Sequence, residues 1–406
     1  MDNISFKIIK YQNGALEKSN NYRSNISFSF NKGKLFWKNQ TYNNIEKIVE
    51  EINLFKNHMI SFKNKHDFIK RKNPKISLVI TLHNQCNYLL SIYSSIQYQE
   101  LKDIEIIFVD DASIDNTSII IKQLMQKDKR IIYLKNNRTR RAFYTRKKGI
   151  LKAKGEYILC IDPDDLIINN ILIKVYETAK QYDLDIVQFY ALRGYIEAPT
   201  LWNETKYKDG ILKTNKEIRN NFYHSKSRNL WDKLVRKSIY LKSINFMDKQ
   251  FENQIYYVNN DDTAFFGLLH VARTYGFLEQ IGYFYIIRPH GTYYYRNDPK
   301  NMNKIFLSIA NNMKYFYIQS DNNTLEKCKL AYNYFEKSMY YFGNYIPFVN
   351  KELNYILDVF DLYLNSTYFN ETQKKQLFYY KSKFIPKKKK RIFNLYNILK
   401  FFKLFY

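Results

Sequence analysis

Two clusters of aspartate residues have the spacing that metal or phosphate chemistry needs. One lies in VDDASIDNT (109–117) and the other in CIDPDDL (160–166). In extended backbone, residues two apart point to the same side, so the carboxylates of Asp162 and Asp164 can face one ligand. Clustered carboxylates repel one another unless a cation joins them. Mg²⁺ or Mn²⁺ fits best, because these ions prefer oxygen ligands and retain open positions for phosphate. The aspartates concerned are Asp110, Asp111 and Asp115, followed by Asp162, Asp164 and Asp165.

The elements that must position these carboxylates form an alternating pattern. Unbroken apolar strands separated by amphipathic helices predict an α/β fold with a mostly parallel sheet and helices on both faces. Ligands of such sheets bind beyond the carboxyl ends of the strands, where both clusters stand. The strands are expected at 76–82, 104–110, 130–134, 157–162 and 185–190, and the helices at 88–99, 117–127, 143–153 and 170–182.

Helix capping is the competing interpretation of the aspartates, because Asp is a favoured N-cap residue. It could account for Asp115 and for one of Asp164 and Asp165. It does not explain two acidic clusters at corresponding strand ends of one sheet, so we favour the ligand-binding interpretation.

The run from Ile76 to about Tyr190 resembles the family 2 glycosyltransferases, which have the GT-A fold. The resemblance implies that Thr81 and Asn84, in ISLVITLHNQCNYL, contact the nucleotide, and VDDASIDNT resembles the family's nucleotide-binding V-D-D-x-S-x-D-x-T element. In that element Asp110 and Asp111 belong to the nucleotide site, where Asp111 would hydrogen-bond the base.

The next segment, RRAFYTRKKGILKAKGEYILCIDPDD (140–165), resembles the stretch that ends in the family's D-x-D motif. Carried over, Arg146 would contact the diphosphate. Asp162, Asp164 and Asp165 would bind ribose and metal, with Asp164 as the best metal ligand.

A candidate catalytic base follows in VNNDDTAFFGLL (258–269), which resembles the family's E-D-x-x-F motif. Asp262 occupies the place of the base, and Asp261 replaces the usual Glu. The resemblance implies that Asp262 accepts the proton of the acceptor hydroxyl, with inversion at the anomeric carbon. The alternative is that Asp262 caps a helix over 263–271.

Two further segments resemble the acceptor side of the family. SRNLWDKLVRKSIY (227–240) resembles its W-x-K-L segment, and FYIIRPHGTY (284–293) resembles its closing Y-R-x-x-x-G-S segment. We expect Trp231, Lys233 and His290, together with Asp261, to lie near the acceptor. The alternatives are that Trp231 packs in the core and that His290 is a hydrogen-bonded part of the scaffold.

The chain departs from the family pattern at four positions, which together bear on the loop 136–148. Ala112 stands where Gly is common, His83 where Tyr is common, and Lys147 where Asn often follows the Arg. Arg138 replaces the glycine usually found after Asn137. These departures concern the donor side and leave the metal and base positions untouched.

The implied reaction transfers a sugar from a UDP- or GDP-linked donor to a glycan, lipid-linked or protein acceptor. The composition is also compatible with a second function. With 65 Lys+Arg against 38 Asp+Glu, the net charge of +27 also suits a basic protein that binds nucleic acid or membrane and carries an inactive glycosyltransferase-like domain. The retained carboxylates argue against nucleic acid, because phosphate binding comes from cations. A nucleotidyltransferase is disfavoured since TLHNQCNYL lacks a Gly-rich phosphate loop.

The rest of the chain suggests additions around this domain. No signal-peptide-like or membrane-length apolar run is recognised, so we expect a cytoplasmic protein. Its basic, amphipathic tail would bind an anionic membrane surface or pack as a helix. The expected parts are an extension with a packing helix (1–74), a GT-A-like domain (75–300, divided into a nucleotide-binding half, 75–190, and an acceptor half, 191–300), a helical extension (301–385) and the tail (386–406).

Overall fold

The computed structural model describes the sheet domain, the helices that cover it and part of the C-terminal region. The helix expected near 44–59, His290 and the tail 386–406 lie outside the described residues. Those residues are 29–31, 34–37, 40–42, 69, 72–168, 170–195, 198–202, 214, 217–218, 228–251, 260–288, 299–318, 332, 334–336, 338–339, 346, 349, 353–365 and 369–384.

The chain forms two compact units, Met1–Lys47 and Ile48–Tyr406. The first contains a small antiparallel sheet of β1 (Ser29–Asn31), β2 (Lys34–Trp37) and β3 (Gln40–Tyr42). The second contains the site and is described below.

A nine-stranded mixed sheet is the centre of the larger unit in the described part of the chain, with eight strands in the order β6-β5-β4-β7-β11-β9-β12-β8. The first four are parallel to one another. β11 runs antiparallel between β7 and β9, β12 is parallel to β9, and β8 and β10 add antiparallel edges. The strands are β4 (Ile76–Leu82), β5 (Ile104–Asp110), β6 (Ile131–Lys135), β7 (Tyr157–Ile161), β8 (Leu166–Ile167), β9 (Ile186–Tyr195), β10 (Ala198–Trp202), β11 (Lys233–Arg236) and β12 (Tyr275–Ile286).

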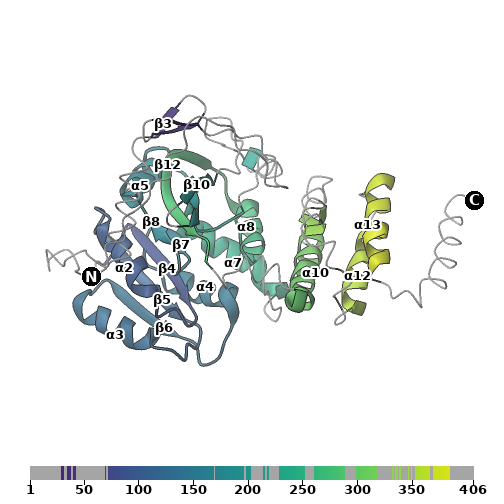
Figure 1. Cartoon of the computed structure of the whole chain (residues 1–406), viewed down its shortest axis with the longest axis horizontal. Helices are drawn as coiled ribbons and strands as arrows, with labels where there is room; N and C mark the ends of the chain where they lie inside the picture. The colour runs from purple at the N-terminus through teal and green to yellow at the C-terminus, as the bar shows by residue number, and fades with distance from the viewer. Residues whose placement is uncertain are drawn as a thin grey trace, which may run out of the picture. The chain divides into compact units, whose positions relative to one another are not determined.

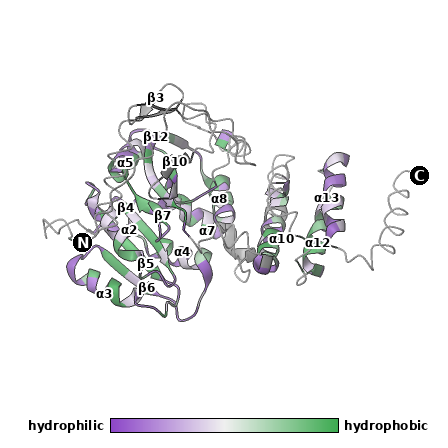
Figure 2. Cartoon of the chain, in the orientation of Figure 1, coloured by the Kyte–Doolittle hydropathy of each residue, from purple (hydrophilic) through white to green (hydrophobic). Residues whose placement is uncertain are grey.

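Helices cover both faces of this sheet, as the apolar strands predict (Figure 1). Because side chains alternate along a strand, Leu78 belongs to one hydrophobic cluster and Val79 to the other. The Leu78 face packs on α2 (Leu89–Tyr98), α3 (Thr117–Lys127) and α5 (Ile171–Gln181), and the Val79 face packs on α4 (Arg141–Lys152), α7 (Lys237–Phe251) and α8 (Asn260–Val271). Figure 2 shows the hydrophobic strands between helices of mixed colour.

The expected elements between 76 and 190 match the structure to within a few residues, and the α/β fold class with helices on both faces of the sheet is confirmed. The order of the sheet was not predictable to the same degree. β11 enters between β7 and β9, and β9 continues to Tyr195. β11 has only four residues, KLVR, which is too short for a periodic signal.

The described residues of 301–385 are mainly helical, as expected. α10 (Met302–Ile318), α12 (Leu353–Leu364) and α13 (Glu371–Lys383) share the hydrophobic cluster on the Val79 face of the sheet. None of the helices in the described part of the chain combines the length and the hydrophobicity that a bilayer-spanning segment requires.

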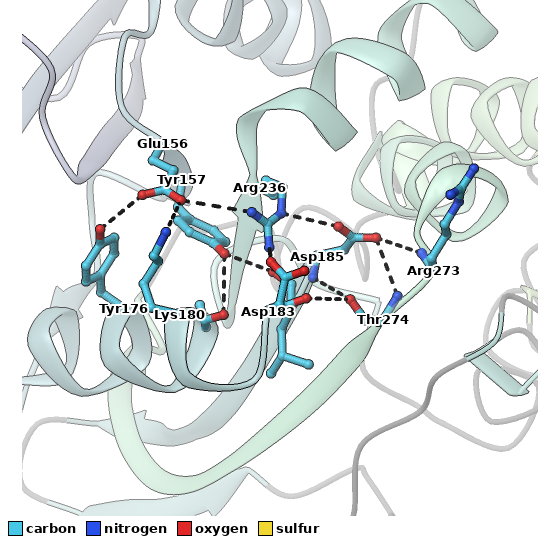
Figure 3. Close-up of polar contacts among 11 residues, drawn as sticks. Glu156, Tyr157, Tyr176, Lys180, Asp183, Asp185, Arg236, Arg273 and Thr274 are labelled. Carbon is cyan, nitrogen blue, oxygen red and sulfur yellow. Dashed lines mark hydrogen bonds and ion pairs between the residues drawn. The ribbon is translucent and has the colours of Figure 1, made fainter.

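A cluster of ion pairs around Arg236 connects β11 to its neighbours at the amino-terminal edge of the parallel strands (Figure 3). The Arg236 guanidinium contacts Asp183 at 2.6 Å and Asp185 at 3.3 Å, lies 3.9 Å from Glu156, and covers the Tyr157 ring at 5.0 Å. These partners come from the starts of β7 and β9, so one side chain joins both neighbours of β11. The cluster lies at the opposite edge of the sheet from the aspartates.

Candidate functional site

Both aspartate clusters lie at the carboxyl edge of the sheet. β5 ends at Asp110 and β7 at Ile161, with β4 between them, so the two strand ends are roughly 10 Å apart at ordinary strand spacing. Asp162 and Asp164 occupy the turn between β7 and β8, with side chains 32% and 33% exposed. These are the two expected ligands that solvent and a cation can reach.

Arg146 joins this turn to α8. Its Nη1 lies 3.0 Å from Asp261 Oδ1, and its Nη2 lies 3.7 Å from Asp162 Oδ1. The position of Arg146 follows from the close packing of α4, because a Cβ on Gly149 would lie 2.5 Å from Val79 Cγ1. Carboxylates almost a hundred residues apart in sequence thereby flank one buried guanidinium.

The first turn of α8 contains both Asp261 and Asp262. The alternative that Asp262 caps a helix over 263–271 is wrong, because α8 begins at Asn260. The carboxylate of Asp262 is 15% exposed and pairs with Arg228, whose Nη1 lies 3.2 Å from Oδ1.

Two arginines at the site were not among the predicted residues. Besides Arg228, the Arg288 guanidinium donates from Nε to the Asp164 carbonyl at 3.0 Å and lies 4.2 Å from the centroid of the Tyr88 ring. Both arginines stand inside segments that resemble family motifs. The sequence pattern did not single them out, because lysine and arginine are abundant throughout the chain.

The electrostatics of the β7–β8 turn favour a bound cation. Burial, with the negative charges of Asp261 and Asp164 and against the charge of Arg146, raises the pKa of Asp162 to about 7. Burial also raises the pKa of Asp164, against the effect of Arg288. Crowded carboxylates of this kind gain from a divalent ion, whose binding would release protons.

A site for such an ion would be open rather than preformed. No group of three or more His, Cys, Asp or Glu side chains is arranged to hold a metal within the described residues. Two accessible carboxylates that leave the remaining positions to phosphate and water fit the coordination habit of Mg²⁺ and of similar ions. The donor set therefore fits the expected cation.

Two expected ligands are instead buried and hold the backbone. Asp165 is 2% exposed and accepts hydrogen bonds from the Tyr283 hydroxyl (2.8 Å) and the Ile286 N–H (2.9 Å). Asp110 is fully buried and accepts from the Ser113 N–H at 2.8 Å and from the Tyr133 hydroxyl at 2.7 Å. Both carboxylates face internal donors in this structure, and the expectation that Asp165 binds metal and Asp110 the nucleotide stays a prediction.

The capping alternative for the second cluster is also wrong. β8 follows Asp164 and Asp165, and α5 begins only at Ile171, after Asn170. In the first cluster, the Asp115 carboxylate accepts from the Thr117 N–H at 3.0 Å at the start of α3.

Asp111 holds the loop before α4. Its buried carboxylate accepts hydrogen bonds from Asn136 Nδ2 at 2.8 Å and from the N–H groups of Arg140 and Arg141 at 2.7 and 2.8 Å. Those N–H groups belong to the start of α4, which carries Arg146. A contact between Asp111 and a base stays a prediction.

The loops near Asp111 contain two residues in the left-handed region. Asn84 has φ 54° and accepts from the Ile114 N–H at 3.0 Å. Ala112 has φ 60°, a conformation that explains why glycine is common at its position in the family. Thr81 is partly exposed at the end of β4. Thr81 and Asn84 therefore lie at the edge where a nucleotide is expected, and their role stays a prediction.

Trp231 and Lys233 are both buried. Trp231 is buried and stacks on Tyr283, with ring centroids 4.5 Å apart. The Lys233 side chain is 0% exposed, and its Nζ lies 2.6 Å from Asp232 Oδ1 and 2.7 Å from the Asn229 carbonyl oxygen. Lys233 belongs to β11 and is directed into the core. The burial of Trp231 agrees with the core alternative, and an acceptor contact of either residue stays a prediction.

Known proteins resemble this chain over the same region. Residues 77–242 match the family model Glycosyl transferase family 2. The glycosyltransferase GlyG of Streptococcus pneumoniae is 36% identical over 112 residues, which cover 28% of this chain and 37% of that protein. The cholesterol galactosyltransferase of Borreliella burgdorferi is 31% identical over 180 residues, 42% of this chain and 50% of that protein. The chain thus spans half or less of these relatives.

Solved structures resemble it over a longer stretch. The crystal structure of S. aureus TarS 1–349 has a TM-score of 0.56 at 14% identity and covers 76% of this chain and 88% of that chain. At this identity the likeness shows the fold alone, which is of the GT-A type. The motif order, the sheet and the family match agree over one region, and residues 77–242 form a domain that matches the glycosyl transferase family 2 model.

Proposed function

We propose that this protein is a glycosyltransferase that moves a sugar from a nucleoside diphosphate-sugar to an acceptor hydroxyl, with inversion and with the aid of a divalent cation. The observation that carries the proposal is the Arg146 guanidinium between Asp162 and Asp261, which gathers the end of β7 and the start of α8 at one place. The family match and the curated relatives, which are named as glycosyltransferases, support the reaction class. A related TarS structure, with a TM-score of 0.50, is a complex with UDP, which supports a nucleotide donor.

Asp164 and Asp162 would hold Mn²⁺ or Mg²⁺. When bound, the ion would act as a Lewis acid for the charge that develops on the leaving diphosphate. Arg146 would add a fixed positive charge beside it, since its buried guanidinium is already oriented by Asp261. Arg288 fixes the backbone at Asp164 through the carbonyl contact.

Asp262 would act as the general base. Its carboxylate is partly exposed and paired with Arg228, a cation that favours the ionised form needed to accept a proton. Removal of the proton from the acceptor hydroxyl as the sugar departs gives a single displacement with inversion. Asp261, beside it, accepts a hydrogen bond from Arg146 Nη1 at 3.0 Å.

The donor would be UDP- or GDP-linked, and the acceptor a glycan, a lipid-linked molecule or a protein. The rival, a basic binding protein with an inactive domain, is disfavoured, because Asp162, Asp164, Asp261 and Asp262 together would repel the phosphates that it must bind.

A donor panel with Mn²⁺, read by mass spectrometry of the released nucleoside diphosphate, tests the proposal. Asp262→Asn and Asp164→Asn should each lower turnover by about 10²- to 10⁴-fold, the range for loss of a general base or of a charge clamp. Asp358→Asn, at an exposed position of α12, is the matched control. Full turnover by Asp262→Asn would remove the proposed mechanism.

A further inference from the structure

A buried polar network connects the C-terminal helices to the first turn of α8. Thr263 follows the candidate base, and its hydroxyl donates to the Asn312 side-chain oxygen in α10. The Asn312 amide in turn donates to the Tyr334 hydroxyl at 2.9 Å. The side chains of Thr263, Asn312 and Tyr334 are all buried.

A second set of contacts links Tyr334 to the candidate base Asp262 through Arg228. The Tyr334 ring lies under the Arg228 guanidinium, with Cζ 5.7 Å from the ring centroid. Arg228 pairs with Asp262 at 3.2 Å. Asp262, Thr263, Asn312, Tyr334 and Arg228 therefore form a closed circuit of contacts. In it, α10 contacts the residue that follows Asp262, and Tyr334 contacts the arginine that pairs with Asp262.

Asn312 is the central hydrogen-bonding group of this circuit. Its oxygen accepts from Thr263 and its amide donates to Tyr334, so one buried side chain pairs with both hydroxyls. A buried donor or acceptor that loses its partner is costly, which gives such networks a single preferred geometry. Asn312 and Tyr334 both lie beyond residues 77–242, the part of the chain that matches the family.

We propose that Asn312 and Tyr334 are positioning residues for Asp262, so that the C-terminal helical segment is part of the active site rather than an appended module. The inference rests on the proposed function, in which Asp262 is the base. Asn312 holds the backbone of the base through Thr263. Tyr334 holds Arg228, and through it the orientation of the carboxylate.

The same helices offer matched controls. Asn311, the neighbour of Asn312 on α10, accepts a hydrogen bond from the Tyr355 hydroxyl at 2.8 Å. Tyr363 donates to the Met313 carbonyl at 2.9 Å. These contacts also join α10 to the C-terminal helices, but they are not part of the circuit to Asp262. A role limited to holding the helices together would make Asn311 and Asn312 equivalent.

The test compares Asn312→Leu with Asn311→Leu in the full chain, by donor turnover with Mn²⁺ and by thermal unfolding. Asn312→Leu should lower kcat by about 10- to 100-fold, the size expected for a misplaced catalytic group, with the donor KM little changed. Asn311→Leu should lower Tm by a similar amount without that loss of kcat. Equal effects of both variants on kcat would overturn the proposal.

Two variants of Tyr334 separate its contacts. Tyr334→Phe keeps the ring under Arg228 and loses the hydroxyl, whereas Tyr334→Leu loses both. The kcat of the Phe variant should lie between those of wild type and the Leu variant, and the reverse order would contradict the proposal. Amide exchange gives a readout without turnover: Asn312→Leu, and not Asn311→Leu, should speed exchange in the first turns of α8.

Asp262→Asn, run beside these variants, separates the two hypotheses. If Asp262→Asn retains turnover, the proposed function fails. If Asp262→Asn loses turnover while Asn312→Leu behaves like Asn311→Leu, only the positioning role fails.

Discussion

Asp162 should weaken the fold of the metal-free protein at neutral and alkaline pH. Its pKa of about 7 lies above the ordinary value of 3.8, a difference of about three units. Since the folded pKa is raised, the penalty is absent below pH 4, grows as the pH rises toward 7, and is complete above it. Three units correspond to about 4 kcal/mol. The side chain is 32% exposed, so we reduce this for solvent screening to about 1–2 kcal/mol.

Asp162→Asn removes the charge that causes this penalty. In EDTA the variant should be more stable than wild type by about 1–2 kcal/mol at pH 8, with a smaller difference at pH 5, and it should lose transferase activity. Urea unfolding across pH 5–8.5 measures the difference. Mn²⁺ should stabilise wild type more than the variant, because the ion would bind the Asp162 carboxylate, which the variant lacks.

The control for this measurement is Asp358→Asn, which removes an exposed charge from α12 and should show no comparable pH dependence. A stability difference for Asp162→Asn that stays constant from pH 5 to 8.5, or a wild type more stable than the variant at pH 8, would refute the reasoning.

Three further substitutions test other parts of the structure. Arg146→Met leaves Asp261 without its guanidinium contact; it should lower donor kcat/KM by about 100-fold or more in initial-rate assays, and a loss below about threefold would contradict its role. Arg236→Met opens the cluster at the far edge of the sheet (Figure 3); urea unfolding should show a loss of about 1–3 kcal/mol while kcat stays near wild type. Ala112→Gly relieves a left-handed φ of 60° and should raise stability by about 1 kcal/mol; a lower Tm would show that the φ is not strained.

Much of the framework could be predicted from local pattern. The strand at 104–110 and the helix at 117–127 agree with β5 and α3 residue for residue, because apolar runs and amphipathic periods are properties of neighbouring residues. The location of both aspartate clusters at one edge followed from the rule for parallel strands, and Asp162 and Asp164 are accessible there.

The role of each carboxylate depended on which donors the fold brings to it. Asp165 and Asp162 stand in one motif. The Asp165 carboxylate accepts a hydrogen bond from Tyr283, whereas the Asp162 carboxylate is open to solvent. The family resemblance predicts that Lys233 lies near the acceptor, whereas in the structure its side chain on β11 pairs with Asp232. Hydrogen-bond partners this distant in sequence leave no local signal.

The sequence by itself determined the strands and helices and the edge where the acidic groups gather, because these depend on residue type and short-range period. Only the tertiary structure decided that Arg146 meets Asp261, 115 residues away, and that Asn312 meets Thr263 across 49 residues. Such contacts arise when separate elements pack, and their geometry depends on the register of β11 and the docking of α8 and α10 rather than on any segment alone.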